Sequence, residues 1–201
     1  MNLRWSTVAV AFAVVILPIA PAQADQNRGH VQNTVDVSAR VTARATEVTV
    51  DSSWIPFSVA EAGSFSRRFT FSSAGPVLVT VTDVYCRGDK FRVFDGQEDL
   101  GLTSEPAKPD DCDENIKNPD KALASDHFSH GIFAVGAGAH VLRIQIVKSP
   151  YGGAGAVFRL DPAPTPESKS DCKDSGWRAL YTMAGHTFGN QGLCVSSVAR
   201  G

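Results

Sequence analysis

The fold is decided by residues 65–96, which read FSRRFTFSSAGPVLVTVTDVYCRGDKFRVFDG. Phe65, Phe69 and Phe71 share one parity, and polar residues stand between them. In residues 77–82 valines alternate with leucine and threonine, which favours a strand buried on both faces. Alternation with a period of two, bounded by Gly, Pro and Asp, is typical of β-strands. This stretch therefore predicts consecutive strands joined by short turns.

The same alternation continues on both sides of this stretch. It recurs in residues 35–50, 140–146 and 156–160. No window of about twelve residues shows the apolar stripe of a helix. Residues 25–162 therefore predict an all-β domain, a β-sandwich or jelly roll of about seven to nine strands. A segment of this length buries a core without help from crosslinks.

The first 24 residues have the pattern of an export signal. Arg4 supplies a positive charge ahead of an apolar run at 8–19, and the Ala-Gln-Ala tripeptide at 22–24 is a small-x-small cleavage site. The run is too short for a membrane span, so an uncleaved anchor is the less favoured alternative. We expect cleavage after Ala24, no membrane span in the mature chain, and a secreted, extracellular protein.

The composition is that of a folded domain without a strong charge. Of the 201 residues, 43% are hydrophobic and 20% are charged, and the formal net charge is -2. Proteins that bind nucleic acid through bulk charge usually carry a basic stripe, so we expect no nucleic-acid partner. We expect the chain to be a monomer.

Four cysteines follow the predicted leader. An even number in an exported chain predicts disulfides, and three pairings are open. Proximity in the sequence favours Cys86–Cys112 and Cys172–Cys194. A zinc site with four thiolates is the alternative, but no C-x2-C spacing supports it.

A proline-rich stretch divides the chain near residue 162. Alternating prolines in 163–170 predict a stiff, extended linker between the sandwich and a small module at 171–201. The module is too short to fold without a crosslink, which a Cys172–Cys194 disulfide would supply. The side chains expected to form its core are Trp177, Leu180, Tyr181, Phe188 and Val195.

Three aspartates stand at expected strand ends: Asp83 ends one strand, Asp89 precedes the next, and Asp95 ends it. Calcium takes six to eight oxygen ligands, commonly including two or more carboxylates, so these three are candidate calcium ligands. The other interpretation is that they are turn residues whose side chains cap their own backbone. Calcium is the one cofactor that the sequence suggests.

A long segment at 103–128 is rich in acidic residues. Loops of this length are usually functional or are held in place, and Cys112 would hold this one. We therefore expect Asp110, Asp111 and Asp113 to belong to a ligand-binding face.

Exposed aromatic side chains bind sugars by stacking, and the candidates are Trp54, Tyr85, Tyr151 and Trp177. Core packing is the alternative, and it is favoured for Trp54 because this residue stands inside an apolar run. Tyr151 lies between a proline and a glycine. We therefore expect it at an exposed loop tip and assign it to ligand binding.

Motifs for nucleophilic catalysis are missing from the sequence. It contains neither G-x-S-x-G, nor a cysteine beside a histidine, nor H-E-x-x-H. His127 and His130, with His140 further along the chain, could form a transition-metal site, but solvated loop histidines are the favoured interpretation. The tripeptide at 87–89, Arg-Gly-Asp, matches one that adhesion receptors bind, but it also fits a tight turn. We predict no catalytic residue and expect a protein that is not an enzyme.

Two parts of the sequence resemble known families. Residues 81–96 (VTDVYCRGDKFRVFDG), 100–104 (LGLTS) and 136–140 (GAGAH) resemble a β-sandwich domain of secreted, mostly uncharacterised microbial proteins. The tail resembles a two-cysteine module at the C-terminus of many exported bacterial proteins, although Ser175 stands where that module has glycine. A more distant likeness to CUB domains, in which acidic residues hold calcium, rests on Asp89 and Asp95.

Together these features predict a secreted, non-catalytic binding module for a glycan or cell-surface component, with calcium as a stabilising ion. The sandwich would be the scaffold, and residues 97–128 with the turns at Asp83 and Asp95 would form the ligand face. One alternative is an extracellular hydrolase whose site forms only in three dimensions. The other is a structural or adhesive surface protein.

Overall fold

The computed structural model describes residues 45–106 and 111–200. The predicted leader, its cleavage after Ala24, and Asp110 lie outside these residues. Within them the chain is built mainly of strands, so the all-β prediction is confirmed. No helix in these two ranges is long and apolar enough to cross a lipid bilayer.

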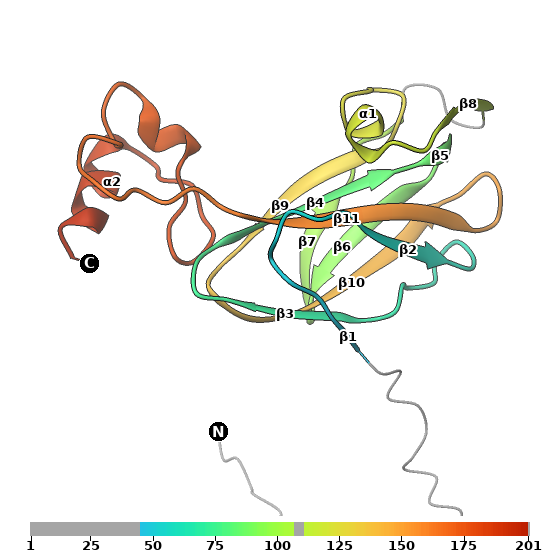
Figure 1. Ribbon diagram of the computed structural model, residues 1–201, viewed down its shortest axis with the longest axis horizontal. Helices are drawn as coiled ribbons and strands as arrows, with labels where there is room; N and C mark the ends of the chain where they lie inside the picture. Colours follow the sequence, from blue (N-terminus) through green and yellow to red (C-terminus); the bar gives the residue numbers. More distant parts are fainter. Residues whose placement is uncertain (1–44, 107–110, 201) are drawn as a thin grey trace, which may run out of the picture. The chain divides into compact units, whose positions relative to one another are not determined.

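The described strands form two facing sheets and a small ribbon (Figure 1). The five-stranded sheet has the order β1 (Thr46–Glu47), β3 (Phe69–Ser73), β10 (Gly138–Lys148), β6 (Lys90–Asp95) and β7 (Glu98–Leu102). The four-stranded sheet has the order β2 (Ile55–Val59), β11 (Ala154–Pro162), β4 (Val77–Asp83) and β9 (His130–Val135). The ribbon pairs β5 (Tyr85–Arg87) with β8 (Asp111–Ile116).

The core lies between the two sheets and follows the alternation in the sequence. Val79 on β4 and Phe158 on β11 point inward from one sheet, and Ile144 on β10 points inward from the other; all three are fully buried. The Phe158 ring packs against those of Phe57 and Phe69, with centroids 6.2 and 4.7 Å away. Aromatic contacts of this kind add to the free energy gained by burying the rings.

The strand β4 is buried on both faces, as its sequence predicted. Thr80 and Thr82, on its outward face, are 2% and 0% exposed. Part of this face is covered by α1 (Pro119–Leu123), which contacts both β4 and β8. The sequence prediction missed both elements, because it interpreted 103–128 as one irregular loop and α1 is shorter than a helical pattern can reveal. The local start signal was present: the Asn118 side chain accepts from the Lys121 N–H, and Pro119 opens the helix.

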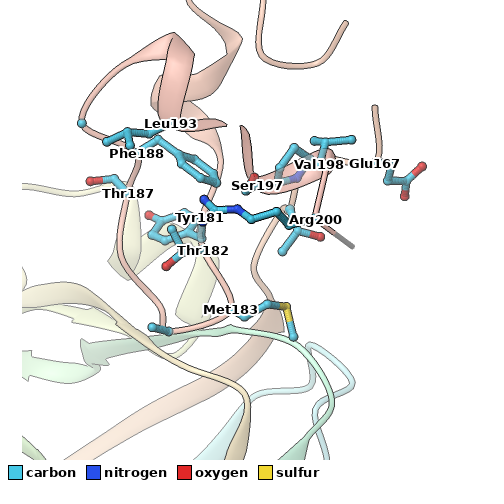
Figure 2. Close-up of a pocket in the computed structure, with 14 residues that line it drawn as sticks. Glu167, Tyr181, Thr182, Met183, Thr187, Phe188, Leu193, Ser197, Val198 and Arg200 are labelled. Atoms are coloured by element: carbon cyan, nitrogen blue, oxygen red, sulfur yellow. The ribbon is translucent and has the colours of Figure 1, made fainter. Parts of the chain in front are cut away.

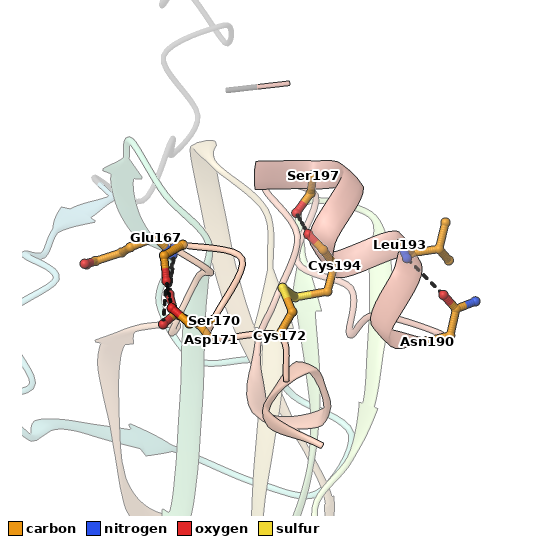
Figure 3. Close-up of a disulfide and its surroundings, with 9 residues drawn as sticks. Glu167, Ser170, Asp171, Cys172, Asn190, Leu193, Cys194 and Ser197 are labelled. Carbon is orange, nitrogen blue, oxygen red and sulfur yellow. Dashed lines mark hydrogen bonds between the residues drawn. A yellow bond between two sulfur atoms is a disulfide. The ribbon is translucent and has the colours of Figure 1, made fainter. Parts of the chain in front are cut away.

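The C-terminal segment, residues 171–200, has a separate small core. Cys172, Phe188 and Cys194 are buried at its centre, and Trp177, Leu180, Val195 and Val198 pack around them. A 3-10 helix (Gly176–Ala179) supplies Trp177, and α2 (Gln191–Val198) supplies Cys194, Val195 and Val198. The other core residues lie in the segments before and between these helices. Figure 3 shows the Cys172–Cys194 disulfide joining α2 to the preceding loop. Tyr181, which the sequence placed in this core, instead lines a groove described below.

The first residues of the predicted linker are hydrogen-bonded to other parts of the chain. The Ala163 N–H donates to Pro76 O, and the Tyr181 N–H donates to Pro164 O. At its other end, Asp171 accepts the N–H groups of Glu167 and Ser168 and closes a turn (Figure 3). The boundary at 163–170 stays a prediction, but these bonds describe a tethered segment rather than a freely hinged one.

Candidate functional site

Two buried carboxyl groups lie together where β4 ends and β6 begins. Asp83 is 0% exposed and Asp89 is 3% exposed. The Asp89 N–H donates to Asp83 Oδ2 at 3.2 Å, while Asp83 Oδ1 and Asp89 Oδ1 have no hydrogen-bond partner. Buried carboxylate oxygens are normally hydrogen-bonded, so this pair calls for an explanation.

Burial controls the protonation of this pair. Removal from water, followed by repulsion from Asp89, raises the pKa of Asp83 to about 8, although backbone N–H groups of the loop oppose this shift. Removal from water raises the pKa of Asp89 to about 6, and the nearby Ser149 hydroxyl opposes that shift. At neutral pH the pair therefore holds about one proton, which is the behaviour of coupled acids.

The loop that carries the pair is held by a glycine and a disulfide. Gly88 has a φ of 129°, which a side chain would strain, and it lets the chain turn from β5 into β6. The Cys86–Cys112 disulfide joins β5 to β8, so both predicted pairings are confirmed. Since this bond closes the ribbon, it fixes the approach of the 83–89 loop to the sandwich.

Asp95 does not join the other two aspartates. It lies six residues beyond Asp89 along β6, a span of about 20 Å in an extended strand. Its Oδ2 lies 2.6 Å from His140 Nδ1, and its Oδ1 accepts the Val141 N–H at 2.9 Å. The expectation of one calcium site built from all three aspartates is therefore wrong in its geometry. Among the described residues, no three His, Cys, Asp or Glu side chains form a metal-binding group.

Tyr85 is the most unusual residue beside the acid pair. Its φ of 70° is rare for a tyrosine and costs on the order of 1 kcal/mol. The side chain is 48% exposed. A Cβ at position 155 would lie 3.4 Å from two carbons of the Tyr85 ring, so the ring rests on Gly155. The strained backbone thus places an aromatic ring on the sheet surface.

A hollow of about 530 Å³ opens beside the Tyr85 ring. Its lining residues are Pro56, Phe57, Ser58, Arg67, Tyr85, Gly155, Ala156 and Val157. Tyr85 is a candidate from the sequence, whereas Arg67 and Gly155 are not. Arg67 and Gly155 belong to segments that are distant from Tyr85 in the sequence. Local sequence patterns therefore cannot predict that they lie beside it.

Tyr151 lies in the hairpin between β10 and β11 and is 46% exposed, as expected. It follows Ser149 by two residues, just as Tyr85 follows Asp83 by two. We call segment 83–89, which includes β5, and hairpin 149–153 together the tyrosine end. Both exposed rings are therefore close in sequence to groups of the buried acid cluster.

The two tryptophan candidates are engaged by neighbouring side chains. The Trp54 ring lies under the Arg159 guanidinium at 4.7 Å, and its Nε1 donates to Asp120 Oδ1. Trp177 packs against the small C-terminal core. Neither ring has the exposed setting of the two tyrosines.

The remaining candidates are the acidic residues of the 103–128 segment, the Arg-Gly-Asp tripeptide and the loop histidines. Asp111 lies on β8, which also contains residue 113, and the side chains of Asp111 and Asp113 lie outside what the structure describes. Arg87 and Asp89 are 4% and 3% exposed, so the Arg-Gly-Asp tripeptide is not presented to a receptor. His130 Nδ1 lies 2.9 Å from Phe128 O.

The buried acid pair does not form a catalytic cleft. A glycosidase needs two carboxyl groups that face a substrate. Asp83 and Asp89 are almost fully buried, and neither lines the hollow beside Tyr85. In this arrangement a substrate does not reach them.

No family model matches the sequence, and no curated protein matches it. Among solved structures, the pre-peptidase C-terminal domain of a collagenase from Bacillus anthracis is similar to 59% of this chain and to 95% of its own length. The two are 14% identical, with a TM-score of 0.36. A likeness at this level carries no information about function, which rests on the residues described above.

Proposed function

We propose that this chain is a secreted, non-catalytic module that binds a glycan of a cell surface or matrix through the tyrosine end. The observation that carries the proposal is the pair of half-exposed rings, Tyr85 and Tyr151, on loops anchored beside one buried acid cluster. Sugars present C–H groups on one face, and aromatic rings bind that face while hydroxyl groups stay hydrated.

The strain at Tyr85 supports a binding role. A backbone conformation that costs free energy persists only where the surrounding structure imposes it, and such positions cluster at ligand sites. The ring rests on Gly155 and borders a hollow that also contains the Arg67 side chain. The hollow therefore combines a flat apolar surface with a hydrogen-bond donor, as sugar recognition requires.

The acid pair fits a calcium ion that stabilises this end. Asp83 Oδ1 and Asp89 Oδ1 lack partners and are hard oxygen ligands of the kind that calcium prefers. Calcium would replace the proton that the pair holds at neutral pH, so its binding would strengthen as the pH rises toward the pKa of Asp83. In this role calcium holds the loop and takes no part in a reaction.

Retention on insoluble polysaccharides and cell-wall preparations tests the binding proposal. We expect the oxidised chain to be retained, Tyr85→Ala to reduce retention at least fivefold, and Tyr85→Phe to restore it. Ile132→Ala is the matched control, because Ile132 is an exposed apolar residue on β9, outside the hollow. If no preparation retains the chain, or if Tyr85→Ala and Tyr151→Ala bind normally, the proposal fails.

Thermal unfolding with calcium and with a chelator tests the ion separately. We expect calcium to raise Tm at pH 8 and to have little effect at pH 5, where protons occupy the pair. Asp83→Asn should remove the calcium effect. If calcium leaves Tm unchanged at both pH values, the calcium proposal fails. The retention experiment would still test glycan binding.

A further inference from the structure

The C-terminal segment and the residues before it enclose a groove of about 760 Å³ that the proposed function does not use (Figure 2). Its walls are mainly apolar. The larger apolar side chains that line it are Pro166, Tyr181, Met183, Phe188, Leu193 and Val198. A concave, largely apolar site of this size with few polar groups is the usual form of a small-molecule site.

One face of α2 forms a wall of the groove. Leu193 and Ser197 stand at i and i+4 in α2, positions that share one face of a helix. Arg200 follows in the turn after the helix, where its N–H donates to Ser197 O at 3.2 Å. Cys194 points the other way into the small core. The disulfide therefore fixes the helix rotation that presents Leu193 and Ser197 to the groove.

The opposite wall is held by backbone contacts. The Ala137 N–H donates to Met183 O at 2.8 Å. A Cβ on Gly185 would lie 2.6 Å from Val135 C, so the 182–185 turn packs closely against the β9–β10 connection. A wall built from such contacts keeps its shape without a ligand.

The groove exposes large apolar groups that a folded chain normally covers. Met183 and Leu193 are 57% and 53% exposed. Two of the lining hydroxyl groups are already engaged, since Ser197 donates to Cys194 O and Thr182 Oγ1 accepts the His186 N–H. The exposed side chains of Met183 and Leu193 thus give the groove apolar surface for a ligand.

The positive charge at the groove belongs to Arg200. Its side chain extends across the groove in Figure 2, while the carboxylate of Glu167 points away. Arg200 Nε donates to Ser196 O, and no carboxylate of the described residues forms an ion pair with the guanidinium. Its terminal N–H groups are therefore placed to receive an anion beside an apolar wall.

We propose that this groove binds an amphiphile with one carboxylate head and an unbranched alkyl tail. Arg200 binds the head, since a guanidinium matches the two oxygens of a carboxylate. Met183, Phe188 and Leu193 cover the tail. The site is separate from the tyrosine end and independent of any glycan.

Calorimetric titration of the oxidised chain with dodecanoate, below its micelle concentration, tests the site. Dodecylammonium carries the same tail with the opposite charge and is the matched probe. We expect saturable binding of dodecanoate and at least tenfold weaker binding of dodecylammonium. Equal affinities, or no binding of dodecanoate, would overturn the proposal.

Variants locate the binding and separate it from attraction to a membrane. Arg200→Gln should weaken dodecanoate binding about tenfold, and Leu193→Ala should weaken it by less. Arg178→Gln is the charge-matched control, because Arg178 lies over Trp177 and outside the groove. Full affinity in Arg200→Gln, or retention on anionic phosphatidylglycerol vesicles without dodecanoate binding, would show that the groove is not the site.

Discussion

The sandwich and the C-terminal segment each contain one disulfide, but the two bonds have different settings. Cys86 and Cys112 lie outside the main core, on the ribbon beside the tyrosine end. Cys172 and Cys194 are fully buried and form the centre of their core. The sandwich has enough apolar residues to form a core, so its disulfide only positions the β5–β8 ribbon. A segment of thirty residues uses its disulfide as the core itself.

The largest effect should come from opening the main core. Phe158→Ala removes a ring that touches Phe57 and Phe69 between the sheets, and such truncations cost about 3–5 kcal/mol. Urea unfolding followed by circular dichroism measures this loss. The equivalent change in the small core, Phe188→Ala, should leave the sandwich transition nearly unchanged. A shared loss would mean that the two cores unfold as one unit.

Removing each disulfide sharpens the comparison. We expect Cys172→Ser with Cys194→Ser to disorder the C-terminal segment, since a crosslink over such a loop contributes about 3 kcal/mol. Hydrogen exchange read by mass spectrometry should show rapid exchange in α2 and unchanged protection in β4. Cys86→Ser with Cys112→Ser should instead loosen β5 and β8 while the sheets remain protected. The comparison is wrong if both pairs of changes unfold the sandwich.

The acid pair should give the sandwich an unusual pH dependence. The pKa of Asp83 is raised to about 8 in the folded state, so the folded state holds a proton that the unfolded chain releases above pH 4. Its contribution to stability is complete below about pH 4 and is lost as the pH rises to 8. Asp83→Asn, which stays neutral, should remove this loss, on the order of a few kcal/mol at pH 8.

Chelator must be present in that measurement, because calcium would oppose the loss. Asp99→Asn is a suitable control, since Asp99 lies on the surface and pairs with Arg92. A wild type and an Asp83→Asn variant with parallel stability curves from pH 4 to 8 would contradict the assignment.

The smallest loss of stability should come from removing the contact between His140 on β10 and Asp95 on β6. His140 faces Asp95 at one ring nitrogen and Gly136 O at the other, and its ring stacks on Phe71. His140→Asn should therefore cost about 1–2 kcal/mol and lower Tm. His186→Asn, on the surface of the C-terminal segment, is the control. An unchanged Tm in His140→Asn would show that the Asp95 contact contributes nothing.

The sequence could predict features that depend on neighbours along the chain. Alternation in 77–82 predicted a doubly buried strand, and the spacing of the cysteines predicted both disulfides. The contact between Asp95 and His140 could not be predicted from such patterns. It depends on the register that pairs Leu142 with Asp95 and so places His140 beside the carboxylate.

The candidate sites divide in the same way. Tyr151 was predicted from its proline and glycine neighbours, which indicate a turn. The position of the Tyr85 ring depends on its contact with Gly155, seventy residues away in the sequence, and on a positive φ. Sequence patterns predict neither feature. The groove at Arg200 needs α2, an element too short for periodicity to reveal.

The path of β11 has a mechanical consequence. This strand begins at the hairpin that carries Tyr151 and ends where the chain leaves toward the C-terminal segment. It pairs with β2 from Ala154 to Phe158 and with β4 from Ala156 to Pro162, both antiparallel. Suppose that a ligand binds the Tyr85 and Tyr151 rings and that the chain is attached through its C-terminal segment. A pulling force between these two points would act along β11, so the hydrogen bonds to β2 and β4 would be loaded together, in shear. Such a tether would yield slowly under force, at a rate set by unfolding of the whole sheet.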